Sequence, residues 1–262
     1  MPQKLKSPAK INLTLDILAK DTKTGFHKIQ SIIMEYPDLY DEITVEKSDK
    51  IDISFKPEIS CPVEESTVFK AAKLILPSKK GIKITLKKKI PEQAGLGGGA
   101  SNAATTLKAI NKIYELGYTK TELQKFAKKI GMDVPFFLEG KTAFATHFGE
   151  KLKPLPDVYK LFKAKKLEIK ILESEVKVNT KNAYNNVDIT KCGKFTKLTD
   201  KILKAIEKKD IVTILENLHN DFEISVFPEY PFLVKLAQTA LAKKALAVNL
   251  TGSGGALFAI FK

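Results

Sequence analysis

Hydrophobic and polar residues alternate strictly along residues 10–17. The apolar residues fall on one face of an extended chain, and they are Ile11, Leu13, Leu15 and Ile17. The opposite face is polar and holds Lys10, Asn12, Thr14 and Asp16. This period of two predicts a strand that is buried on one side only.

The same alternation predicts further strands along the chain. Residues 41–46 predict a strand that ends in a charged residue. Residues 82–86 predict a strand with one solvent-exposed face, which stops at Pro91. Shorter strands are predicted over residues 167–171, 245–250 and 256–261, the last two as a hairpin.

Apolar residues at helical spacing predict helices between these strands. A short helix is expected over residues 66–75, and a longer one begins around Ser101 or Asn102, both good capping residues. A third helix covers residues 121–130, with Thr121 as its cap. Helices are also expected over residues 201–207 and from Pro231 onward, the latter with inward Leu233, Leu236, Ala237, Ala240 and Leu241.

The composition shifts toward Pro and Lys near residues 154–157, which predicts a domain boundary. Strands and helices occur on both sides of it, and no internal repeat interrupts them. The expected fold class is therefore α+β with two domains, residues 1–155 and 156–262.

The composition is that of a globular protein of 262 residues, 44% of them hydrophobic. No stretch approaches the ~20 consecutive apolar residues of a membrane helix, and no apolar signal segment follows the first lysines. Cys61 and Cys192 stand far apart and outside any C-x-x-C pattern, so we expect no disulfide framework and no zinc site. A cytoplasmic protein is expected.

The formal net charge is +14 with histidine taken as neutral, and every positively charged side chain counted in it is lysine. Anionic small molecules, a membrane surface and nucleic acid are the partners that such a charge attracts. Arginine is preferred for bidentate recognition of bases and phosphates, so its absence argues against nucleic acid. We interpret most of the charge as solvated surface.

The glycine-rich segment Gly95-Leu-Gly-Gly-Gly99 stands directly before a predicted helix. Glycines expose backbone N–H groups there and the helix dipole adds positive charge, so an anion is the expected occupant. A Walker loop would end in Gly-Lys-Ser/Thr, whereas Ala100-Ser101 follows here. A dinucleotide fingerprint fits only loosely, and a turn that needs glycine for its geometry alone is the plain alternative.

Several segments together resemble the GHMP kinase family (galactokinase, homoserine kinase, mevalonate kinase and phosphomevalonate kinase). Residues 91–102, Pro-Glu-Gln-Ala-Gly-Leu-Gly-Gly-Gly-Ala-Ser-Asn, resemble the phosphate loop of that family. Thr251-Gly-Ser-Gly-Gly255 resembles its third glycine motif. The specific branch is indicated by Pro8-Ala-Lys-Ile-Asn-Leu13, Gly25-Phe-His27 and Gly131-Met-Asp-Val-Pro-Phe-Phe137.

The resemblance implies both a fold and an activity. The fold would combine an amino-terminal ATP-binding domain like domain 2 of ribosomal protein S5 with a ferredoxin-like carboxyl-terminal domain, the active site lying in the cleft between them. The activity would be ATP-dependent phosphorylation of the 2-hydroxyl of 4-diphosphocytidyl-2-C-methyl-D-erythritol, in the non-mevalonate pathway to isoprenoid precursors. The cofactors implied are ATP and Mg²⁺, and the partner is a small molecule with a cytidine diphosphate group, without nucleic acid or membrane.

The same resemblance assigns roles to individual residues. It makes Asp133 the catalytic base and Lys10 its partner. ATP would be bound by Pro91, Glu92, Gln93, Ala94, Gly95, Leu96, Gly97, Gly98, Gly99, Ala100, Ser101 and Asn102. The substrate would be bound by Asn12, Phe26, His27, Thr180, Tyr184, Thr251, Gly252, Ser253 and Gly254, with Phe26 and Tyr184 enclosing the cytosine and His27 at its polar edge. Metal ligands are not assigned.

Taken one at a time, these residues also have ordinary structural interpretations. Asp133 precedes Val134-Pro135 and would cap a helix, and Lys10 would be solvated surface. His27 would be a turn histidine, while Phe26 and Tyr184 would be packing aromatics. The phosphate loop also departs from the family, with Ala100 for a usual serine and Gln93-Ala94 where glycine is frequent.

Three other functions remain open at this point. Another GHMP kinase would act on a phosphomevalonate-like or hydroxy-amino-acid substrate and would not need Phe26, His27 and Tyr184. A nucleic-acid-binding module is motivated by Lys87-Lys-Lys89 and the net charge, but would need interleaved aromatics and strong salt dependence. A non-catalytic protein of the same fold would retain the glycines only as turns.

Overall fold

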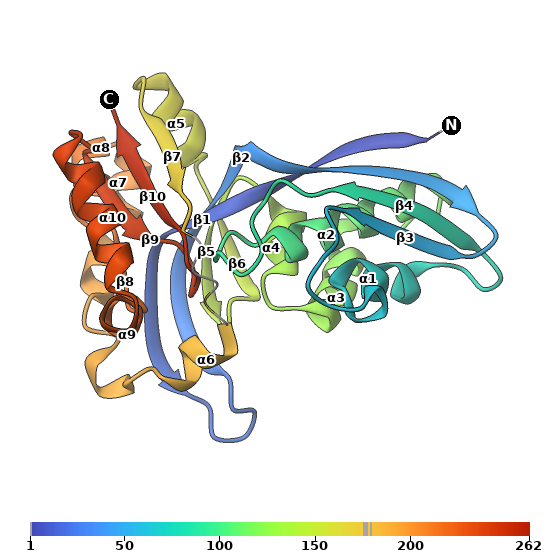
Figure 1. Cartoon of the computed structure of the whole chain (residues 1–262), viewed down its shortest axis with the longest axis horizontal. Coiled ribbons are helices and arrows are strands. Elements are labelled where there is room, and N and C mark those ends of the chain that lie inside the picture. The colour runs from blue at the N-terminus through green and yellow to red at the C-terminus, as the bar shows by residue number, and fades with distance from the viewer. Residues whose placement is uncertain (1, 175–177, 179) are drawn as a thin grey trace. The chain divides into compact units, whose positions relative to one another are not determined.

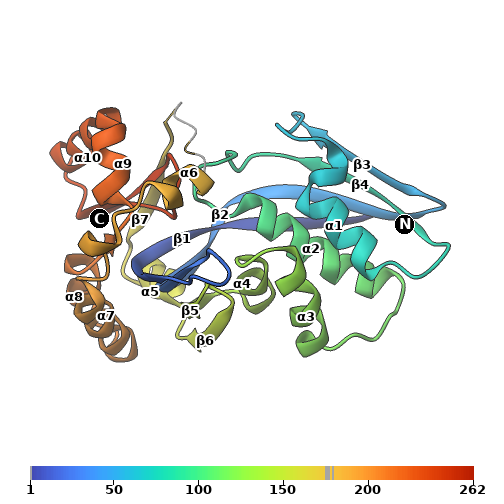
Figure 2. The same ribbon diagram turned by 90° about the horizontal axis from the view of Figure 1, so that it is seen from below.

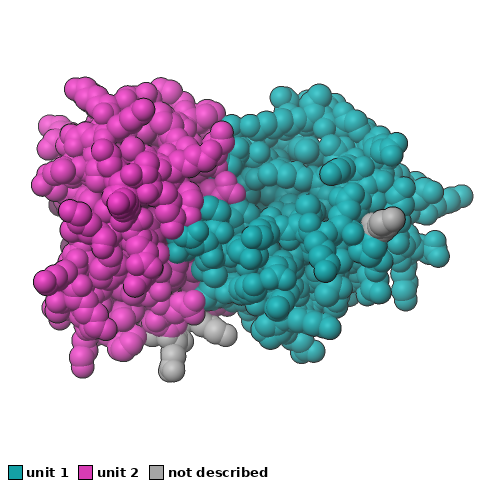
Figure 3. All heavy atoms as spheres, turned by 90° about the horizontal axis from the view of Figure 1, so that it is seen from above, with its two compact units in different colours: residues 1–9, 36–92, 97–140 teal, residues 10–35, 93–96, 141–262 magenta. Residues whose placement is uncertain are grey.

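Figure 1 shows a computed structural model of the chain, which describes residues 2–174, 178 and 180–262. The chain divides into two compact units that interleave along the sequence (Figure 3). Unit 1 comprises Met1–Ala9, Tyr36–Glu92 and Gly97–Gly140, and unit 2 comprises Lys10–Glu35, Gln93–Leu96 and Lys141–Lys262. The division into residues 1–155 and 156–262 stays a prediction.

Two long strands, β1 (Gln3–Lys20) and β2 (His27–Ser48), contribute residues to both units. They are neighbours in a sheet that has seven strands in the described part of the chain, with the order β3-β4-β2-β1-β8. Strand β5 also pairs with β2, and β6 pairs with β5. The other strands of this sheet are β3 (Ile51–Lys56), β4 (Gly81–Lys87), β5 (Thr142–His147), β6 (Lys151–Leu155) and β8 (His219–Asn220).

Unit 1 builds its core between strands and a helical layer. Strand β4 pairs antiparallel with β2, with Ile43 opposite Leu86, and parallel with β3. The helices are α1 (Thr67–Ile75), α2 (Gly98–Ile113), α3 (Lys120–Ile130) and α4 (Val134–Glu139), after a 3₁₀ turn η1 (Val63–Glu65). Figures 1 and 2 show α1, α2 and α3 packed together along one face of β3 and β4. Their apolar faces are buried there, with Leu107 and Ile110 of α2 fully covered.

Unit 2 contains a second sheet of three strands within the described residues, in the order β7-β10-β9. These are β7 (Glu168–Leu172), β10 (Leu257–Phe261) and β9 (Ala247–Leu250), all antiparallel. The helices are α5 (Val158–Ala164), α6 (Thr180–Asn185), α7 (Thr196–Lys208), α8 (Ile211–Glu216), α9 (Glu223–Glu229) and α10 (Pro231–Ala242), with a 3₁₀ turn η2 (Ile189–Lys191). Helix α10 packs on β9 and β10, and Phe222 and Leu233 are buried in the shared core.

Most of the predicted elements are present. Helix α1 is capped by Ser66, whose hydroxyl accepts a hydrogen bond from the Phe69 amide, and α10 opens at Pro231 as predicted. The hairpin is also confirmed, since β9 and β10 pair with Leu250 opposite Leu257. In the described part of the chain, every helix falls short of the length and apolar character that crossing a bilayer requires.

The prediction that residues 10–17 are buried on one side only is wrong. Both faces of β1 are covered, and Lys10 and Asp16 are 4% and 0% exposed. Strand β1 is an inner strand of its sheet, between β2 and β8, so even its polar residues are enclosed by the chain. Buried polar groups require partners, and these partners build much of the site below.

Three element boundaries also differ from prediction. Helix α2 begins at Gly98 rather than near Ser101, because Gly97 in the left-handed region is its cap. Helix α3 is capped by Thr119 rather than Thr121, through a capping box with Glu122. Strand β4 ends at Lys87, before the predicted stop at Pro91, because the next backbone donors bond to a buried carboxylate.

One inward residue of α10 was also predicted wrongly. Leu241 is 52% exposed, while Leu233 and Ala240 of the same helix are buried. Helix α10 covers its sheet only through a narrow stripe, so an apolar residue at the edge of the predicted face stays in solvent.

Candidate active site

The amino-terminal end of α2 is built to expose backbone donors. Gly97 takes φ 72° and ψ 17° at the cap position and makes no side-chain capping hydrogen bond. The first intrahelical bond runs from the Ser101 amide to the Gly97 carbonyl, at 2.9 Å. The amides of Gly98, Gly99 and Ala100 therefore have no carbonyl four residues before them within the helix. With the helix dipole behind them, they form an anion-binding end.

A buried carboxylate, Asp41 on β2, fixes the chain on both sides of this end. It is fully buried and accepts hydrogen bonds from the amides of Lys89 and Ile90, at 2.7 and 2.8 Å, and from Asn102 Nδ2, at 2.9 Å. Lys88 completes the set by forming an ion pair with the same carboxylate. The segment before the glycine loop and the first turn of α2 are thus held by one side chain.

Further contacts hold the predicted ATP-binding residues of unit 1. The Gly99 carbonyl accepts a hydrogen bond from Thr67 Oγ1, at 2.6 Å, and Ser101 Oγ accepts one from Ser7 Oγ, at 2.7 Å. Glu92 accepts one from the Ser60 amide, at 3.2 Å. Asn102 Oδ1, in contrast, is buried and has no partner in the structure. The hydroxyl of Ser101 and the side-chain nitrogen of Asn102 therefore help to hold the shape of this loop.

In unit 2, Lys10 and Asn12 lie side by side on β1. Lys10 Nζ donates to Asn12 Oδ1 at 2.5 Å, and Asn12 Nδ2 donates to Ser31 Oγ at 2.8 Å. Lys10 is almost fully buried, so the interpretation of this lysine as solvated surface is wrong. The Asn12 amide also donates to Thr251 Oγ1, at 3.3 Å, which brings the glycine-rich turn at 251–255 to the same place.

Two backbone segments meet closely beside Lys10. A Cβ added to Gly95 would lie 1.9 Å from the Thr251 carbonyl oxygen, and one added to Gly254 would lie 2.1 Å from the Gly95 amide nitrogen. A Cβ on Gly252 would lie 3.1 Å from Lys10 Nζ. Glycine is therefore required here because backbone touches backbone. Ala94, Leu96 and Ser253 are buried within the same contact.

Gln93 departs from the family's glycine but adopts a conformation that glycine would favour. Its φ is 56°, in the left-handed region, and its carbonyl accepts a hydrogen bond from the Gly255 amide at 3.4 Å. Glutamine at position 93 therefore introduces backbone strain, but the segment still contacts the 251–255 turn.

The predicted cytidine-binding residues form three aromatic contacts in unit 2. His27 stacks on Tyr184 with ring centroids 5.1 Å apart, and Tyr184 meets Phe222 edge-on. Phe26 is 50% exposed and contacts Phe148 at 5.7 Å rather than Tyr184. Burial, with a smaller contribution from the Lys20 charge, lowers the pKa of His27. The side chain of Thr180, at the first position of α6, lies outside the described residues.

Asp133 occupies the cap position of α4, followed by Val134 and Pro135 as in a typical helix start. Asp133 is therefore at the predicted cap position, but its side chain makes no capping hydrogen bond. The carboxylate is thus left available for another partner.

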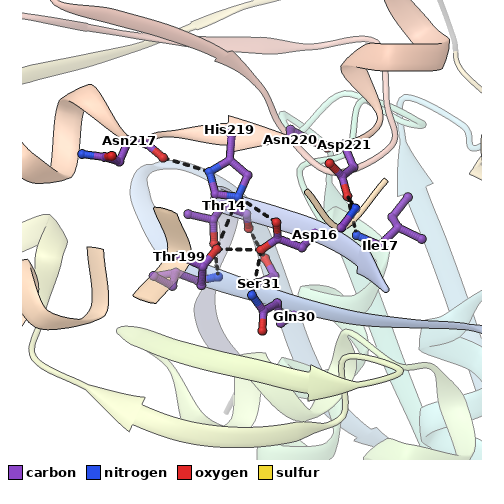
Figure 4. A network of polar contacts seen from close by, with 12 residues as sticks. Thr14, Asp16, Ile17, Gln30, Ser31, Thr199, Asn217, His219, Asn220 and Asp221 are labelled. Atoms are coloured by element: carbon purple, nitrogen blue, oxygen red, sulfur yellow. Dashed lines mark hydrogen bonds and ion pairs between the residues drawn. The ribbon is translucent and has the colours of Figure 1, made fainter. Parts of the chain in front are cut away.

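Sequence reasoning missed a buried polar network around β8, shown in Figure 4. Asp16 Oδ1 lies 3.0 Å from His219 Nε2, and Asp16 Oδ2 accepts hydrogen bonds from Thr199 Oγ1 and Gln30 Nε2. Burial alone would lower the pKa of His219, but the hydrogen bond to Asp16 and the Asn217 carbonyl outweigh it and raise that pKa. The only available signal was the polar alternation along residues 10–17, which did not reveal its partners.

The residues after His219 continue this network. Asp221 Oδ2 accepts hydrogen bonds from the amides of Ile17 and Gly193, both at 2.7 Å, while its Oδ1 is buried and has no partner. Burial raises the pKa of Asp221, more than its hydrogen bonds lower it. Burial likewise raises the pKa of Glu223 to about 7. Nothing in the spacing of these residues indicated such a cluster.

Comparison with known proteins agrees with this geometry. Residues 66–141 match the GHMP kinases N terminal domain, and residues 202–262 match the GHMP kinases C terminal domain. The 4-diphosphocytidyl-2-C-methyl-D-erythritol kinase of Caldicellulosiruptor bescii is 37% identical over 98% of this chain and 89% of its own length. The chain belongs to the GHMP kinase family. The enzyme of the same name from Alkaliphilus metalliredigens is 33% identical to this GHMP kinase over 98% of the chain and 87% of its own length.

Solved structures show that this GHMP kinase has the two-domain fold of its family. A crystal structure of 4-(cytidine 5'-diphospho)-2C-methyl-D-erythritol kinase is 28% identical and superimposes with a TM-score of 0.79, covering 99% of this chain and 90% of that one. Homoserine kinase from Cytophaga hutchinsonii shares the fold at 21% identity and a TM-score of 0.74, with 99% and 85% of the two chains covered.

Proposed function

We propose that this GHMP kinase transfers the γ-phosphoryl group of ATP to the 2-hydroxyl of 4-diphosphocytidyl-2-C-methyl-D-erythritol. The observation that carries the proposal is the stacked pair of His27 and Tyr184, with the exposed Phe26 next to His27 in the chain, in the same unit as Lys10 and Asn12. Aromatic faces bind a nucleobase by stacking, which contributes ~1–3 kcal/mol per base. A phosphomevalonate or a hydroxy-amino acid offers no base to stack.

The amino-terminal end of α2 supports binding of the ATP phosphates. Its uncapped amides carry a partial positive charge, and Lys88 Nζ, ion-paired with Asp41, lies 3.4 Å from the position of a Cβ on Gly98. Binding the three phosphates of ATP at this helix end would require several of these donors to act together.

Mg²⁺ would neutralise charge on the phosphates during transfer, and the site is compatible with an ion held mainly by ATP. Mg²⁺ usually keeps several waters and binds through substrate phosphates with one or two carboxylates. The described residues hold no group of three His, Cys, Asp or Glu side chains that could form a cage by themselves.

Phosphoryl transfer depends more on positioning and charge than on a strong base. We assign Asp133 the role of accepting or orienting the proton of the 2-hydroxyl, and Lys10 the role of stabilising charge on the attacking oxygen. Asn12 and Ser31 hold the Lys10 ammonium in one orientation through their chain of hydrogen bonds. This pre-organisation avoids reordering a flexible lysine at each turnover.

His27 is suited to the polar edge of a pyrimidine. Its lowered pKa keeps the imidazole neutral at pH 7, with one donor and one acceptor. Cytosine presents a complementary amino donor and ring acceptors.

Two free cysteines, Cys61 and Cys192, are compatible with a reducing compartment, and we infer that the protein acts in the cytoplasm on this small molecule.

A coupled assay of ADP release tests the proposal. The purified chain is incubated with ATP, Mg²⁺ and, in parallel, 4-diphosphocytidyl-2-C-methyl-D-erythritol, phosphomevalonate or homoserine. We expect turnover only with the first, and ³¹P NMR of its product should show a new phosphomonoester. Turnover with another acceptor would overturn the assignment of substrate, and absence of turnover with all three would overturn the assignment as an active kinase of these substrates.

A further inference from the structure

Asn220, at the end of β8, uses its side chain to hold the turn at 251–255. Its Nδ2 donates to the carbonyls of Leu250 and Gly252, at 3.0 and 2.8 Å. Its Oδ1 accepts a hydrogen bond from the Phe222 amide, at 3.0 Å. Asn220 is only 4% exposed, and both hydrogens of its amide are used by this turn.

A second side chain from the same segment acts on the same residue. Glu223 Oε1 accepts a hydrogen bond from the Leu250 amide, at 2.8 Å. Side chains at positions 220 and 223 therefore bind both backbone polar groups of Leu250, the last residue of β9. These side-chain bonds act together with the backbone hydrogen bond from the Thr251 amide to the Ala256 carbonyl, at 3.2 Å, in fixing the entrance to the turn.

The position of this turn decides what surrounds Lys10. Thr251 Oγ1 accepts a hydrogen bond from the backbone amide of Asn12. A Cβ on Gly252 would come within 3.1 Å of Lys10 Nζ and 2.9 Å of the Gly95 carbonyl oxygen. Packing this close leaves no room for the turn to shift without moving its neighbours. A displaced turn would therefore hold Thr251–Gly254 away from the place where they would bind the acceptor.

We propose that Asn220 is a positioning residue for the acceptor substrate, fixing the carbonyls of Leu250 and Gly252 and thereby the place of Thr251–Gly254 beside Lys10 and Asn12. The substrate-binding part of this inference rests on the proposed function. The fixing of the turn follows from the hydrogen bonds alone and is testable without any substrate.

Asn220→Asp separates the two tasks of this side chain. The variant keeps an oxygen for the Phe222 amide but replaces both donors with a carboxylate oxygen that faces two carbonyls. Asn220→Ser keeps one donor and adds no charge, so it serves if the aspartate variant does not fold. Asn217→Asp is the matched control, because the Asn217 amide donates to the Thr213 carbonyl and does not bond to the turn.

The first measurement is hydrogen exchange of the backbone amides of residues 251–255 in the free protein. Loss of two buried hydrogen bonds should speed this exchange about tenfold or more in Asn220→Asp, less in Asn220→Ser, and little in Asn217→Asp. The second measurement is steady-state kinetics. The KM for the acceptor should rise about tenfold or more in Asn220→Asp, while the KM for ATP stays within about twofold.

Each outcome bears on a distinct part of the inference. Exchange in Asn220→Asp that matches Asn217→Asp would overturn the fixing of the turn. Faster exchange with a fall in kcat alone, or with equal rises in both KM values, would overturn its role toward the acceptor substrate. Faster exchange in a chain whose wild type turns over no acceptor would support the fixing of the turn and count against the proposed function instead.

Discussion

Two glycine-rich segments lie in this chain, at residues 95–99 and 251–255. Two pairs of glycines within them need the absence of a side chain for different reasons. At Gly98 and Gly99 an added Cβ would meet only side-chain atoms, at 3.0 and 3.4 Å. At Gly95 and Gly254 it would overlap backbone atoms, at 1.9 and 2.1 Å. The first pair leaves the start of α2 free of backbone contacts, as an anion site there would require, and the second pair lets two backbones touch.

The side chains that support the two segments also differ. Asp41 holds the start of α2 through four donors, one of them the charged Lys88. Asn220 holds the 251–255 turn through uncharged hydrogen bonds. A run of glycines is thus no single motif, and the interpretations as a phosphate loop and as a turn each apply to different glycines of one run.

The largest effect is expected at neither segment, because both would bind and position ligands while Asp133 would take part in the chemistry. Asp133→Asn should lower kcat by about 10²–10⁴, equivalent to about 3–5 kcal/mol, with little change in either KM. Because this carboxylate does not cap α4, the unfolding midpoint should change little. Steady-state kinetics and thermal unfolding check both statements, and near-normal turnover would remove Asp133 from this role.

A pair of alanine variants tests the different use of glycine directly. Gly95→Ala places a Cβ against the Thr251 carbonyl at a positive φ of 77°, and should cost about 2–5 kcal/mol of stability. Gly99→Ala adds a helix-favouring residue whose Cβ would make only an ordinary contact, 3.4 Å from Thr67 Oγ1, so it should stabilise the chain by up to about 1 kcal/mol while raising the KM for ATP. Denaturant unfolding and kinetics measure these changes, and equal losses of stability would contradict the distinction.

Asp41→Asn tests the charged support of the first segment. The variant leaves Lys88 without its carboxylate in a buried position and should cost about 3–5 kcal/mol. Asp157→Asn is its control, since Asp157 caps α5 and asparagine caps a helix equally well, so its cost should stay below about 0.5 kcal/mol. Urea unfolding compares the two, and equal costs would show that the buried pair contributes little.

The smallest effect is a dependence of stability on pH that arises around β8. The pKa of His219 is raised above 6.5 and that of Glu223 is raised to about 7, so each contributes stability at low pH that is lost as pH rises through its folded value. Asp16, with a lowered pKa, contributes throughout this range. Stability should therefore fall as pH rises from about 4.5 to about 7 through Glu223, and as pH rises above 6.5 through His219.

The control for this pH dependence is Glu223→Gln, which keeps an oxygen for the Leu250 amide but cannot ionise. The decline between about pH 4.5 and 7 should be shallower in this variant, as measured by urea unfolding at several pH values. His27 acts in the opposite direction, because its lowered pKa adds stability as pH rises, and it is the same in the wild type and in the variant. An unchanged slope would mean that Glu223 does not titrate in this range.

Much of the fold followed from local patterns. Alternation placed β4 and the β9–β10 hairpin, and helical spacing with Ser66 and Pro231 placed α1 and α10, because these signals act within a few residues. The family resemblance likewise depended on short motifs such as Gly95–Gly99. Boundaries at Gly98 and Thr119 were missed because caps depend on backbone geometry that several nearby residues can supply.

Only the tertiary structure decided which polar residues are buried and what they contact. The sequence by itself determined that Lys10, Asn12 and Asp16 share one face of a strand, since side chains alternate at a period of two. It did not determine that this face is covered, because the covering residues Ser31, His219 and Thr251 come from segments up to about 240 positions away. Contacts between such distant segments depend on packing, and packing set the roles of Asn220, of Asp41 and of each glycine.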